Sequence, residues 1–286
     1  MKILVTGANG QLGTELLQSL AQTSIEIITA TRSQLDITIH NHVKDYLRYH
    51  RPDWVVNCAA YTDVDLAEKN LEQSYLVNAI GPENLAQVCE SVGSKLLQIS
   101  TNSVFSSDTP KFFTPDDIVN PMNQYSKSKA LGEKLIIENG SKNYWIIRTS
   151  WLYGNYGGKF VHSILEKNYL NNPISVVDDQ FGQPTNSQDL AEFVKSFILE
   201  PPSIGIYHFT NIGYVSRFDL ARQILFFFSG DDSKVKRIKT KKTIGVAERS
   251  RYSLLSLEKD SFTPKNKYIP YDESLRQFLI QRKKIR

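Results

Sequence analysis

Short apolar, β-branched segments alternate with longer amphipathic segments along the first half of the chain. Continuous or alternating apolar residues predict strands, and apolar residues spaced three and four positions apart predict helices. The expected strands are 2–7, 25–31, 54–60 and 95–101, and the expected helices are 11–22, 42–50 and 74–93. Strands that alternate with helices form a parallel sheet with helices on both faces. Because such crossovers are right-handed, the pattern predicts a Rossmann-type, doubly wound α/β fold.

The second half of the chain follows a looser pattern. It predicts strands at 174–179 and 206–211, helices at 187–200 and 218–228, and a basic, mixed segment from about residue 230. We therefore expect a smaller C-terminal α/β domain that faces the substrate. The expected division is an NAD(P)-binding domain of residues 1–150 with about 172–200, and a substrate-binding domain of about 151–171 with 201–286.

The composition is that of an ordinary globular protein. Of the 286 residues, 41% are hydrophobic and 22% are charged, close to average usage. The formal net charge of +4 suits an anionic small molecule and is too small to indicate nucleic-acid binding. The basic segment KVKRIKTKK (234–242) is typical of a solvated edge strand, with phosphate binding as the alternative.

Neither cysteines nor histidines indicate a metal site. Cys58 lies in an apolar segment and Cys89 in an expected helix, so we expect two reduced core thiols. No metal cluster can be assembled from them and five scattered histidines. The chain enters a strand directly after Met1, which leaves no room for a signal peptide, and has no apolar run long enough to span a bilayer. We expect a cytoplasmic protein.

The segment GANGQLG (7–13) follows the first strand and opens the first helix. Gly7 permits a tight turn, Gly10 lets the backbone approach a pyrophosphate, and Gly13 lets the helix pack close to the sheet. Unpaired N–H groups at the start of the helix favour phosphate. A glycine triplet in this strand–turn–helix context predicts a dinucleotide site.

The end of the second strand indicates which dinucleotide binds. NAD sites usually carry a carboxylate there, whereas this chain has Ala30-Thr31-Arg32. Arg32 suits a 2′-phosphate, which predicts NADPH, with NADH as the alternative if Arg32 is only a surface residue. Asp36 is placed to accept from an adenine amine, or to cap a helix.

Tyr125 and Lys129 are four residues apart where a polar loop gives way to a helical pattern, so they share one helical face. A free phenol has a pKa near ~10, and a neighbouring ammonium is expected to lower it. We therefore predict that Tyr125 passes a proton to a carbonyl oxygen as hydride arrives. Thr101 ends a strand at the edge of the sheet where ligands bind and is placed to donate to the same oxygen.

With these motifs the chain resembles the extended short-chain dehydrogenase/reductases, and among them the dTDP-4-dehydrorhamnose reductase family. The glycine loop and the Tyr/Lys pair are shared by the superfamily, whereas RTSWLYG and DQFGQPT are more specific to this family. The matching stretches are TGANGQLG (6–13), LDIT (35–38), NCAAYTDVDLAE (57–68), VNAIGPENLA (77–86), Tyr125 with Lys129, RTSWLYG (148–154), DDQFGQPT (178–185) and DLA (189–191).

The resemblance implies an NADPH- or NADH-dependent oxidoreductase of nucleotide-sugar and cell-surface polysaccharide biosynthesis. It would reduce the 4-keto group of dTDP-4-dehydro-L-rhamnose to give dTDP-L-rhamnose, as a monomer or homodimer without nucleic-acid or membrane partners. Thr101, Tyr125 and Lys129 fall on the catalytic positions. The cofactor positions are Gly10, Gln11, Leu12, Asp36, Ile37, Ala59, Ala60 and Tyr61, and the substrate-contacting positions are Thr101, Asn102, Trp151 and Arg249.

The chain departs from the family in two places. The family usually has S-T-D-Y-V-F where this chain has STNSVF (100–105), so Asn102 replaces an aspartate and Ser103 a tyrosine. Ser250 stands where proline is common, and the neighbouring Arg249 is predicted either to meet the diphosphate or to form a surface ion pair. Two other readings stay open: a cofactor-binding regulatory subunit similar to the methionine adenosyltransferase beta subunit, and a sugar-nucleotide epimerase or dehydratase.

Overall fold

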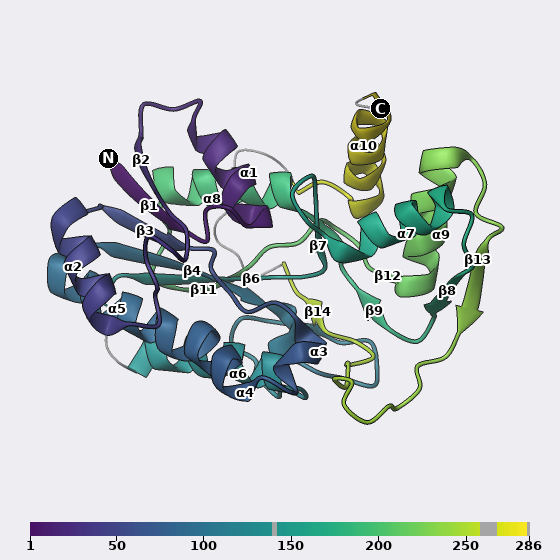
Figure 1. The fold of residues 1–286 in the computed structure, drawn as a ribbon, viewed down its shortest axis with the longest axis horizontal. Coiled ribbons are helices and arrows are strands. Elements are labelled where there is room, and N and C mark those ends of the chain that lie inside the picture. The colour runs from purple at the N-terminus through teal and green to yellow at the C-terminus, as the bar shows by residue number, and fades with distance from the viewer. Residues whose placement is uncertain (139–141, 258–267, 285–286) are drawn as a thin grey trace.

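The computed structural model describes residues 1–138, 142–257 and 268–284 (Figure 1). Residues 139–141 of the first predicted domain, and 258–267 and 285–286 of the second, lie outside the described residues. A six-stranded sheet runs through the larger part of the molecule in the order β11-β6-β4-β3-β1-β2. Its strands, all parallel, are β1 (Lys2–Thr6), β2 (Glu26–Ala30), β3 (Trp54–Asn57), β4 (Lys95–Thr101), β6 (Tyr144–Thr149) and β11 (Gly205–His208).

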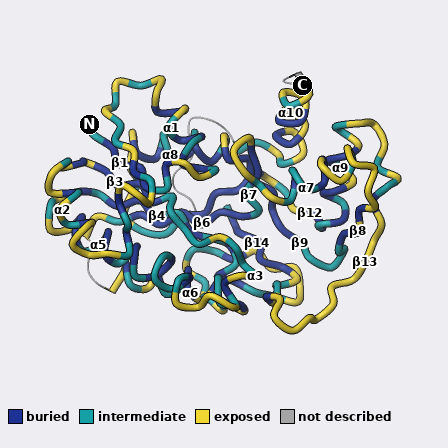
Figure 2. Tube along the Cα trace, viewed as in Figure 1, coloured by how far each residue is buried: buried dark blue, intermediate teal, exposed yellow. Residues whose placement is uncertain are grey.

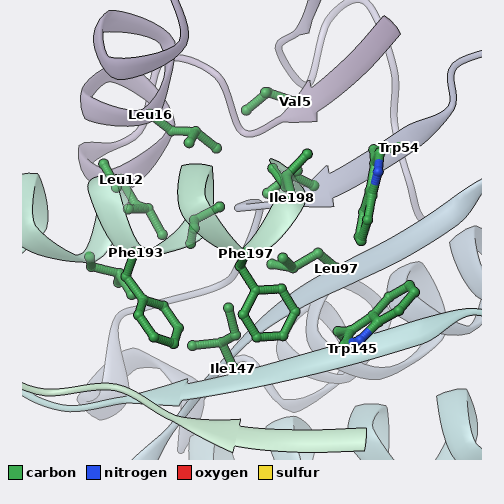
Figure 3. Close-up of a cluster of buried hydrophobic side chains, with 14 of the residues drawn as sticks. Val5, Leu12, Leu16, Trp54, Leu97, Trp145, Ile147, Phe193, Phe197 and Ile198 are labelled. Carbon is green, nitrogen blue, oxygen red and sulfur yellow. The ribbon is translucent and has the colours of Figure 1, made fainter. Parts of the chain in front are cut away.

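Helices cover both faces of this sheet. Ile3 and Val5 of β1 pack with α1 (Gln11–Leu20) and α8 (Ser187–Leu199), and Figure 3 shows this cluster between sheet and helices. The intervening Leu4 belongs to the cluster on the opposite face, with α2 (His40–His50) and α5 (Gly81–Val92). Successive side chains of a strand point to opposite faces, so a fully apolar strand requires a layer on each side. The predicted doubly wound fold is confirmed.

The strand order reverses between β1 and β3. From β1 the chain goes to β2 on one side and then crosses to β3 on the other. At such a point the loops after the two strands diverge and leave a crevice at their carboxyl ends, where ligands of open α/β sheets bind. The glycine loop, the segment after β3 and the end of β4 all open onto this edge.

The predicted helix 74–93 is interrupted. It consists of the end of α4 (Leu71–Tyr75), the π-helical turn η1 (Leu76–Ile80) and α5. At this turn the backbone approaches α6 (Gln124–Glu138) so closely that a Cβ on Gly132 would lie 2.1 Å from the carbonyl oxygen of Asn78. π-Helical turns inside helices occur frequently at functional sites.

A second, smaller lobe has its own core. It comprises α7 (Lys159–Tyr169), β8 (Ile174–Val177), α9 (Arg217–Ser229), β13 (Val235–Ile238) and α10 (Tyr271–Lys284). We call these elements the second lobe. Helix α10 was not predicted from the sequence. The short elements around it and at the crevice are α3 (Val64–Ala67), η2 (Asn102–Val104), β5 (Phe112–Phe113), β7 (Leu152–Tyr153), β9 (Phe181–Gly182), β10 (Thr185–Asn186), β12 (Val215–Ser216) and β14 (Leu254–Leu255).

Two strands lie on the other side of the predicted domain boundary. β8, expected with the NAD(P)-binding part, pairs with β13 and packs in the second lobe. β11, expected in the substrate domain, is the edge strand of the main sheet, where Tyr207 packs edge-to-face on Phe197 of α8. Local sequence patterns identify a strand but not its partner, which explains both differences.

The basic segment 234–242 contains an exposed strand, as expected. β13 pairs with β8 alone among the described strands, and three of its four residues are exposed, as Figure 2 shows. Lys239 and Arg237 form ion pairs with Asp178 at 2.8 and 3.4 Å. None of the helices in the described ranges is long and apolar enough to cross a bilayer.

Candidate active site

A cavity of about 850 Å³ opens at the carboxyl edge of the sheet and continues to the second lobe. Of the predicted site residues, Gly13 alone does not line it, because Gly13 is buried against the backbone of Gly7. The others form its wall: Gly7, Gly10, Gln11, Leu12, Arg32, Asp36, Ile37, Ala59, Ala60, Tyr61, Thr101, Asn102, Tyr125, Lys129, Trp151 and Arg249. Residues from seven separate stretches of sequence therefore meet in one site.

The glycine loop packs too closely for side chains. Gly7 has a φ of +60°, and a Cβ there would lie 2.7 Å from the backbone nitrogen of Ala59. A Cβ on Gly13 would lie 2.3 Å from the carbonyl oxygen of Gly7. Gln11 and Leu12 at the start of α1 line the cavity, and the buried Nε2 of Gln11 has no hydrogen-bond partner among the described residues. These features fit a pyrophosphate.

Arg32 and Asp36 lie at the end of β2. Their side chains form a loose ion pair of 3.6 Å, with Arg32 largely exposed. Asp36 accepts from the backbone N–H of Thr38 at 3.0 Å and from its hydroxyl at 2.7 Å. Burial acts against ionisation, but these bonds and Arg32 lower the pKa of Asp36. Asp36 caps this turn, while α2 begins after Ile39, so the helix-cap alternative is wrong.

Asn78 of η1 supports the segment after β3. Its side chain accepts from the backbone N–H of Tyr61 at 2.9 Å and donates to the carbonyl of Tyr61 at 3.0 Å. It also donates to the hydroxyl of Ser128 on α6 at 3.0 Å. Sequence reasoning missed this residue. The available signal was a polar side chain inside an otherwise apolar helical pattern.

Tyr125 and Lys129 lie in the first turns of α6. Asn123 accepts from the N–H of Ser126 at 2.9 Å, the pattern of a side chain capping a helix start. Tyr125 is hydrogen-bonded to Thr101, and the Nζ of Lys129 donates to the carbonyl of Ile99 at 2.8 Å. The predicted helical face therefore meets the end of β4 as expected.

The prediction that Lys129 lowers the pKa of Tyr125 is wrong. Burial raises the pKa of Tyr125, and the opposing influence is the hydrogen bond with Thr101. Burial also lowers the pKa of Lys129 to about 8, against the opposing influence of the Glu133 carboxylate. Lys129 directs its ammonium to a backbone carbonyl, so the structure favours a protonated phenol at neutral pH.

Both thiols are free in the structure. Cys89 is buried in the core, as expected. Cys58 packs against the core from a half-buried position and also lines the cavity. Burial raises the pKa of Cys58 to about 12, which makes a thiolate inaccessible at neutral pH.

Trp151 explains part of the family motif DQFGQPT. Its φ of +39° is unusual for a large side chain, and such strain clusters at functional sites. A Cβ on Gly182 would lie 2.3 Å from the indole ring. The glycine of the motif therefore makes room for the tryptophan of RTSWLYG.

The two departures from the family lie on facing segments. The side-chain amide of Asn102 donates to the carbonyl of Ser253 at 2.7 Å. The hydroxyl of Ser250 accepts from the N–H of Ser107 at 2.9 Å. Both substitutions therefore tie the segment after β4 to the segment 249–253.

The remaining two predicted or altered residues have local partners. Arg249 forms a bidentate ion pair with Asp65, at 2.9 and 2.8 Å, so the ion-pair alternative is confirmed in this structure. Ser103, which replaces a tyrosine of the family, lines the cavity and shares a hydrogen bond of 2.9 Å with the hydroxyl of Thr101.

Comparison with known proteins agrees with this geometry. The RmlD substrate binding domain family matches residues 1–283. The spore coat polysaccharide biosynthesis protein SpsK of Bacillus subtilis is 38% identical over 284 residues, which cover 98% of each chain. A dTDP-4-dehydrorhamnose reductase of Mycobacterium tuberculosis is 36% identical over 260 residues, 89% of this chain and 84% of the relative.

Solved structures are similar over almost the whole chain. A dTDP-4-dehydrorhamnose reductase from Clostridium acetobutylicum superposes with a TM-score of 0.92 and 37% identity, over 99% of this chain and 100% of the other. The enzyme of that name from Bacillus anthracis, in complex with NADP, superposes with a TM-score of 0.91 and 36% identity. The match covers 98% of this chain and 99% of the other. The fold, the convergent site and these matches show that the chain belongs to the dTDP-4-dehydrorhamnose reductase family.

Proposed function

We propose that the protein is an NADPH-dependent oxidoreductase that reduces the 4-keto group of a dTDP-4-dehydro-6-deoxyhexose. The proposed reaction converts dTDP-4-dehydro-L-rhamnose to dTDP-L-rhamnose. One observation carries the proposal: the phenol of Tyr125, hydrogen-bonded to Thr101, lines the same cavity as the glycine loop. The NADP complex of the Bacillus anthracis relative supports the choice of cofactor.

The reaction needs a hydride at the carbonyl carbon and a proton at the carbonyl oxygen. The reduced nicotinamide, when bound, supplies the hydride. Thr101 donates a hydrogen bond to the carbonyl oxygen, and Tyr125 gives that oxygen its proton. A raised pKa keeps Tyr125 protonated before the step. The proton transfer leaves a phenolate on Tyr125, while Lys129 holds the end of β4, where Thr101 lies, through its hydrogen bond to the carbonyl of Ile99.

The glycine loop and its neighbours are proposed to hold the cofactor. Gly7, Gly10 and Gln11 would bind the pyrophosphate through the start of α1, where the Nε2 of Gln11 has no partner within the part of the chain that the structure describes. Arg32 would bind the 2′-phosphate, because its ion pair with Asp36 is loose and its guanidinium is exposed. The remaining contacts are assigned to Leu12, Ile37, Ala59, Ala60 and Tyr61.

The second lobe is proposed to receive the nucleotide-sugar. The cavity extends from the nicotinamide side of the sheet to α7 and α9 of this lobe. Asn102 and Trp151 would contact the sugar. Arg249 would approach the diphosphate from its present ion pair with Asp65.

The proposal is tested by the absorbance of NADPH in the presence of dTDP-4-dehydro-L-rhamnose. The protein should consume NADPH, and Tyr125→Phe should lower kcat by roughly 100-fold or more while NADPH still binds. Tyr49→Phe, a change of an exposed phenol on α2, is the matched control and should have wild-type activity. Normal turnover by Tyr125→Phe would remove the proton-donor role.

If the wild-type protein does not oxidise NADPH with this substrate, two further observations distinguish the alternatives. Tightly retained cofactor without net oxidation would favour an epimerase or dehydratase. NADPH binding with no turnover of any 4-keto sugar nucleotide, and a stable protein partner on isolation, would favour a regulatory subunit. Either result would overturn the reductase assignment.

A further inference from the structure

Arg217, the first residue of α9, differs from the other cations that line the cavity. The others each have an oxygen partner: Arg32 with Asp36 at 3.6 Å, Lys129 with the carbonyl of Ile99 at 2.8 Å, Lys159 with Asp63 at 2.9 Å, and Arg249 with Asp65 at 2.8 Å. The guanidinium of Arg217 has no acceptor among the residues that the structure describes. A guanidinium carries five N–H donors, so its hydrogen-bonding capacity is left unused.

Aromatic rings hold this guanidinium in place. Its Cζ lies 3.6 Å from the centroid of the Trp151 ring and 4.8 Å from that of Phe160. The backbone is fixed as well, since the N–H of Arg217 donates to the carbonyl of Gln180 at 3.0 Å. Trp151 is itself fixed against Gly182. The charge is therefore positioned before any ligand arrives, which reduces the entropy lost on binding.

The electrostatics of the site favour an anion. Burial and the repulsion of Arg249 lower the pKa of Arg217 to about 9. Both arginines line the cavity, and the carboxylate nearby, Asp65, is already engaged in a bidentate pair with Arg249. A negative group next to Arg217 would relieve the repulsion and use the free N–H donors. Stacked arginine forks match the geometry of phosphate.

We propose that Arg217, stacked on Trp151 and Phe160, binds the diphosphate of a nucleotide-linked substrate. The choice of substrate diphosphate rests on the proposed function. The phosphates of the cofactor are assigned to the glycine loop, the start of α1 and Arg32, whereas Arg217 belongs to the second lobe, at the junction of β12 and α9. The indole of Trp151 thus supports the binding cation in addition to its predicted contact with the sugar.

The test is calorimetric binding of dTDP, UDP, GDP and thymidine to the wild-type protein, Arg217→Met and Arg217→Lys. Loss of a charge-assisted hydrogen bond should weaken binding of the preferred nucleoside diphosphate roughly 10- to 100-fold in Arg217→Met. Arg217→Lys keeps the charge but loses the fork, so its affinity should be intermediate. Thymidine has no phosphate, so its weaker binding should be equal in all three proteins.

A variant on the same helix provides the control. Arg222 of α9 is half-exposed, pairs with Asp232 at 2.7 Å and lies outside the cavity wall. Arg222→Met should bind nucleoside diphosphates like the wild-type protein. Affinity for NADPH, measured by fluorescence, should be unchanged in every variant and also reports whether each variant is folded.

The outcomes separate this proposal from the reductase assignment. One outcome is that the protein reduces no 4-keto sugar while its binding of nucleoside diphosphates still depends on Arg217. In that case the reductase assignment fails, and the diphosphate site at Arg217 is supported. Unchanged diphosphate affinity in Arg217→Met overturns the binding site. An equal loss of NADPH affinity, or no binding of any nucleoside diphosphate by the wild-type protein, overturns it too.

Discussion

Asn78 binds both backbone polar groups of Tyr61, the N–H at 2.9 Å and the carbonyl at 3.0 Å. The first residue lies in a π-helical turn and the second in the loop that borders the proposed cofactor site. Their pairing links a helix irregularity to the shape of the cavity. A regular α-helix would change the direction of the Asn78 side chain, since the π-turn adds a residue to the turn.

Asn78→Ala should therefore lower stability and weaken cofactor binding together. It leaves the part-buried backbone N–H and carbonyl of Tyr61 without their side-chain partner, which costs about 1–3 kcal/mol of the free energy of unfolding. Urea denaturation and NADPH titration measure the two effects. Asn41→Ala, on the exposed surface of α2, should change neither. If Asn78→Ala bound NADPH with wild-type affinity, the link between the π-turn and the cofactor site would be lost.

Lys129 is expected to limit activity at high pH. Its pKa in the folded protein is lowered to about 8 by burial, so above this pH the charge that strengthens its hydrogen bond to the carbonyl of Ile99, two residues before Thr101, is lost. We expect kcat/KM to fall as pH rises through about 8. Lys129→Met should lower kcat roughly 100-fold and abolish this limb. Lys127→Met, an exposed change on the same helix, should keep the wild-type profile.

The same lysine should reduce stability at neutral pH. The folded pKa of about 8 lies below the ordinary value of 10.5, so between these values the unfolded chain binds a proton that the folded one lacks. The free energy of unfolding therefore rises with pH between about 8 and 10.5. Below about pH 8 the lysine is charged in the folded protein, and the whole destabilisation by the buried charge is present. Lys129→Met should raise the free energy of unfolding at neutral pH by roughly 1–3 kcal/mol. A lower stability of this variant would contradict the buried-charge argument.

A buried ion pair joins α6 to β6. The Nη2 of Arg148 on β6 is 2.6 Å from the Oε2 of Glu133 on α6, and both side chains are at most 5% exposed. Ser100 donates to the same carboxylate. Arg148→Met should lower the free energy of unfolding by about 3–5 kcal/mol, because it leaves a buried charge unpaired.

The double variant Arg148→Met/Glu133→Leu separates pairing from packing. It removes both charges, so chemical denaturation should show a smaller loss in the free energy of unfolding than for Arg148→Met alone. If the double variant were less stable by the sum of the two single effects, the two side chains would not be coupled.

Asn102 should not tolerate the aspartate that is usual in the family. Its amide donates to the carbonyl of Ser253 at 2.7 Å, and a carboxylate at this place would oppose one acceptor to another. Asn102→Asp should lower the free energy of unfolding by about 1–3 kcal/mol at neutral pH. The loss should shrink under acidic conditions, where the new carboxyl regains a donor.

Asn120→Asp is a matched control for this change. Asn120 also donates an amide hydrogen bond to a carbonyl, that of Ser106 at 2.9 Å, but at an exposed position. Water can replace the lost bond there, so denaturation should show a much smaller effect. If Asn102→Asp and Asn120→Asp lost the same free energy of unfolding, burial of Asn102 would not explain the effect.

Local sequence patterns were enough to predict the layered fold and the residues around Tyr125 and Lys129. Alternating apolar and amphipathic segments require a parallel sheet covered on both faces, and they placed the strands of the first half within a few residues. The glycines of 7–13 are needed locally, because a side chain at Gly7 or Gly13 would meet backbone atoms. Helical spacing likewise put Tyr125 and Lys129 on one face, and both line the cavity.

Which strands join the main sheet, and how the pKa values of the site shift, depend on the tertiary structure. Whether β8 or β11 joins the main sheet depends on partners distant in the sequence. The pKa of Tyr125 rises because of burial and responds to Thr101 rather than to Lys129. The surroundings of Arg217 follow from folding alone, since Trp151 and Phe160 stack on its guanidinium and no described residue accepts from it. Periodicity and spacing describe neighbours along the chain, whereas burial, charge and hydrogen bonding depend on residues that folding brings together.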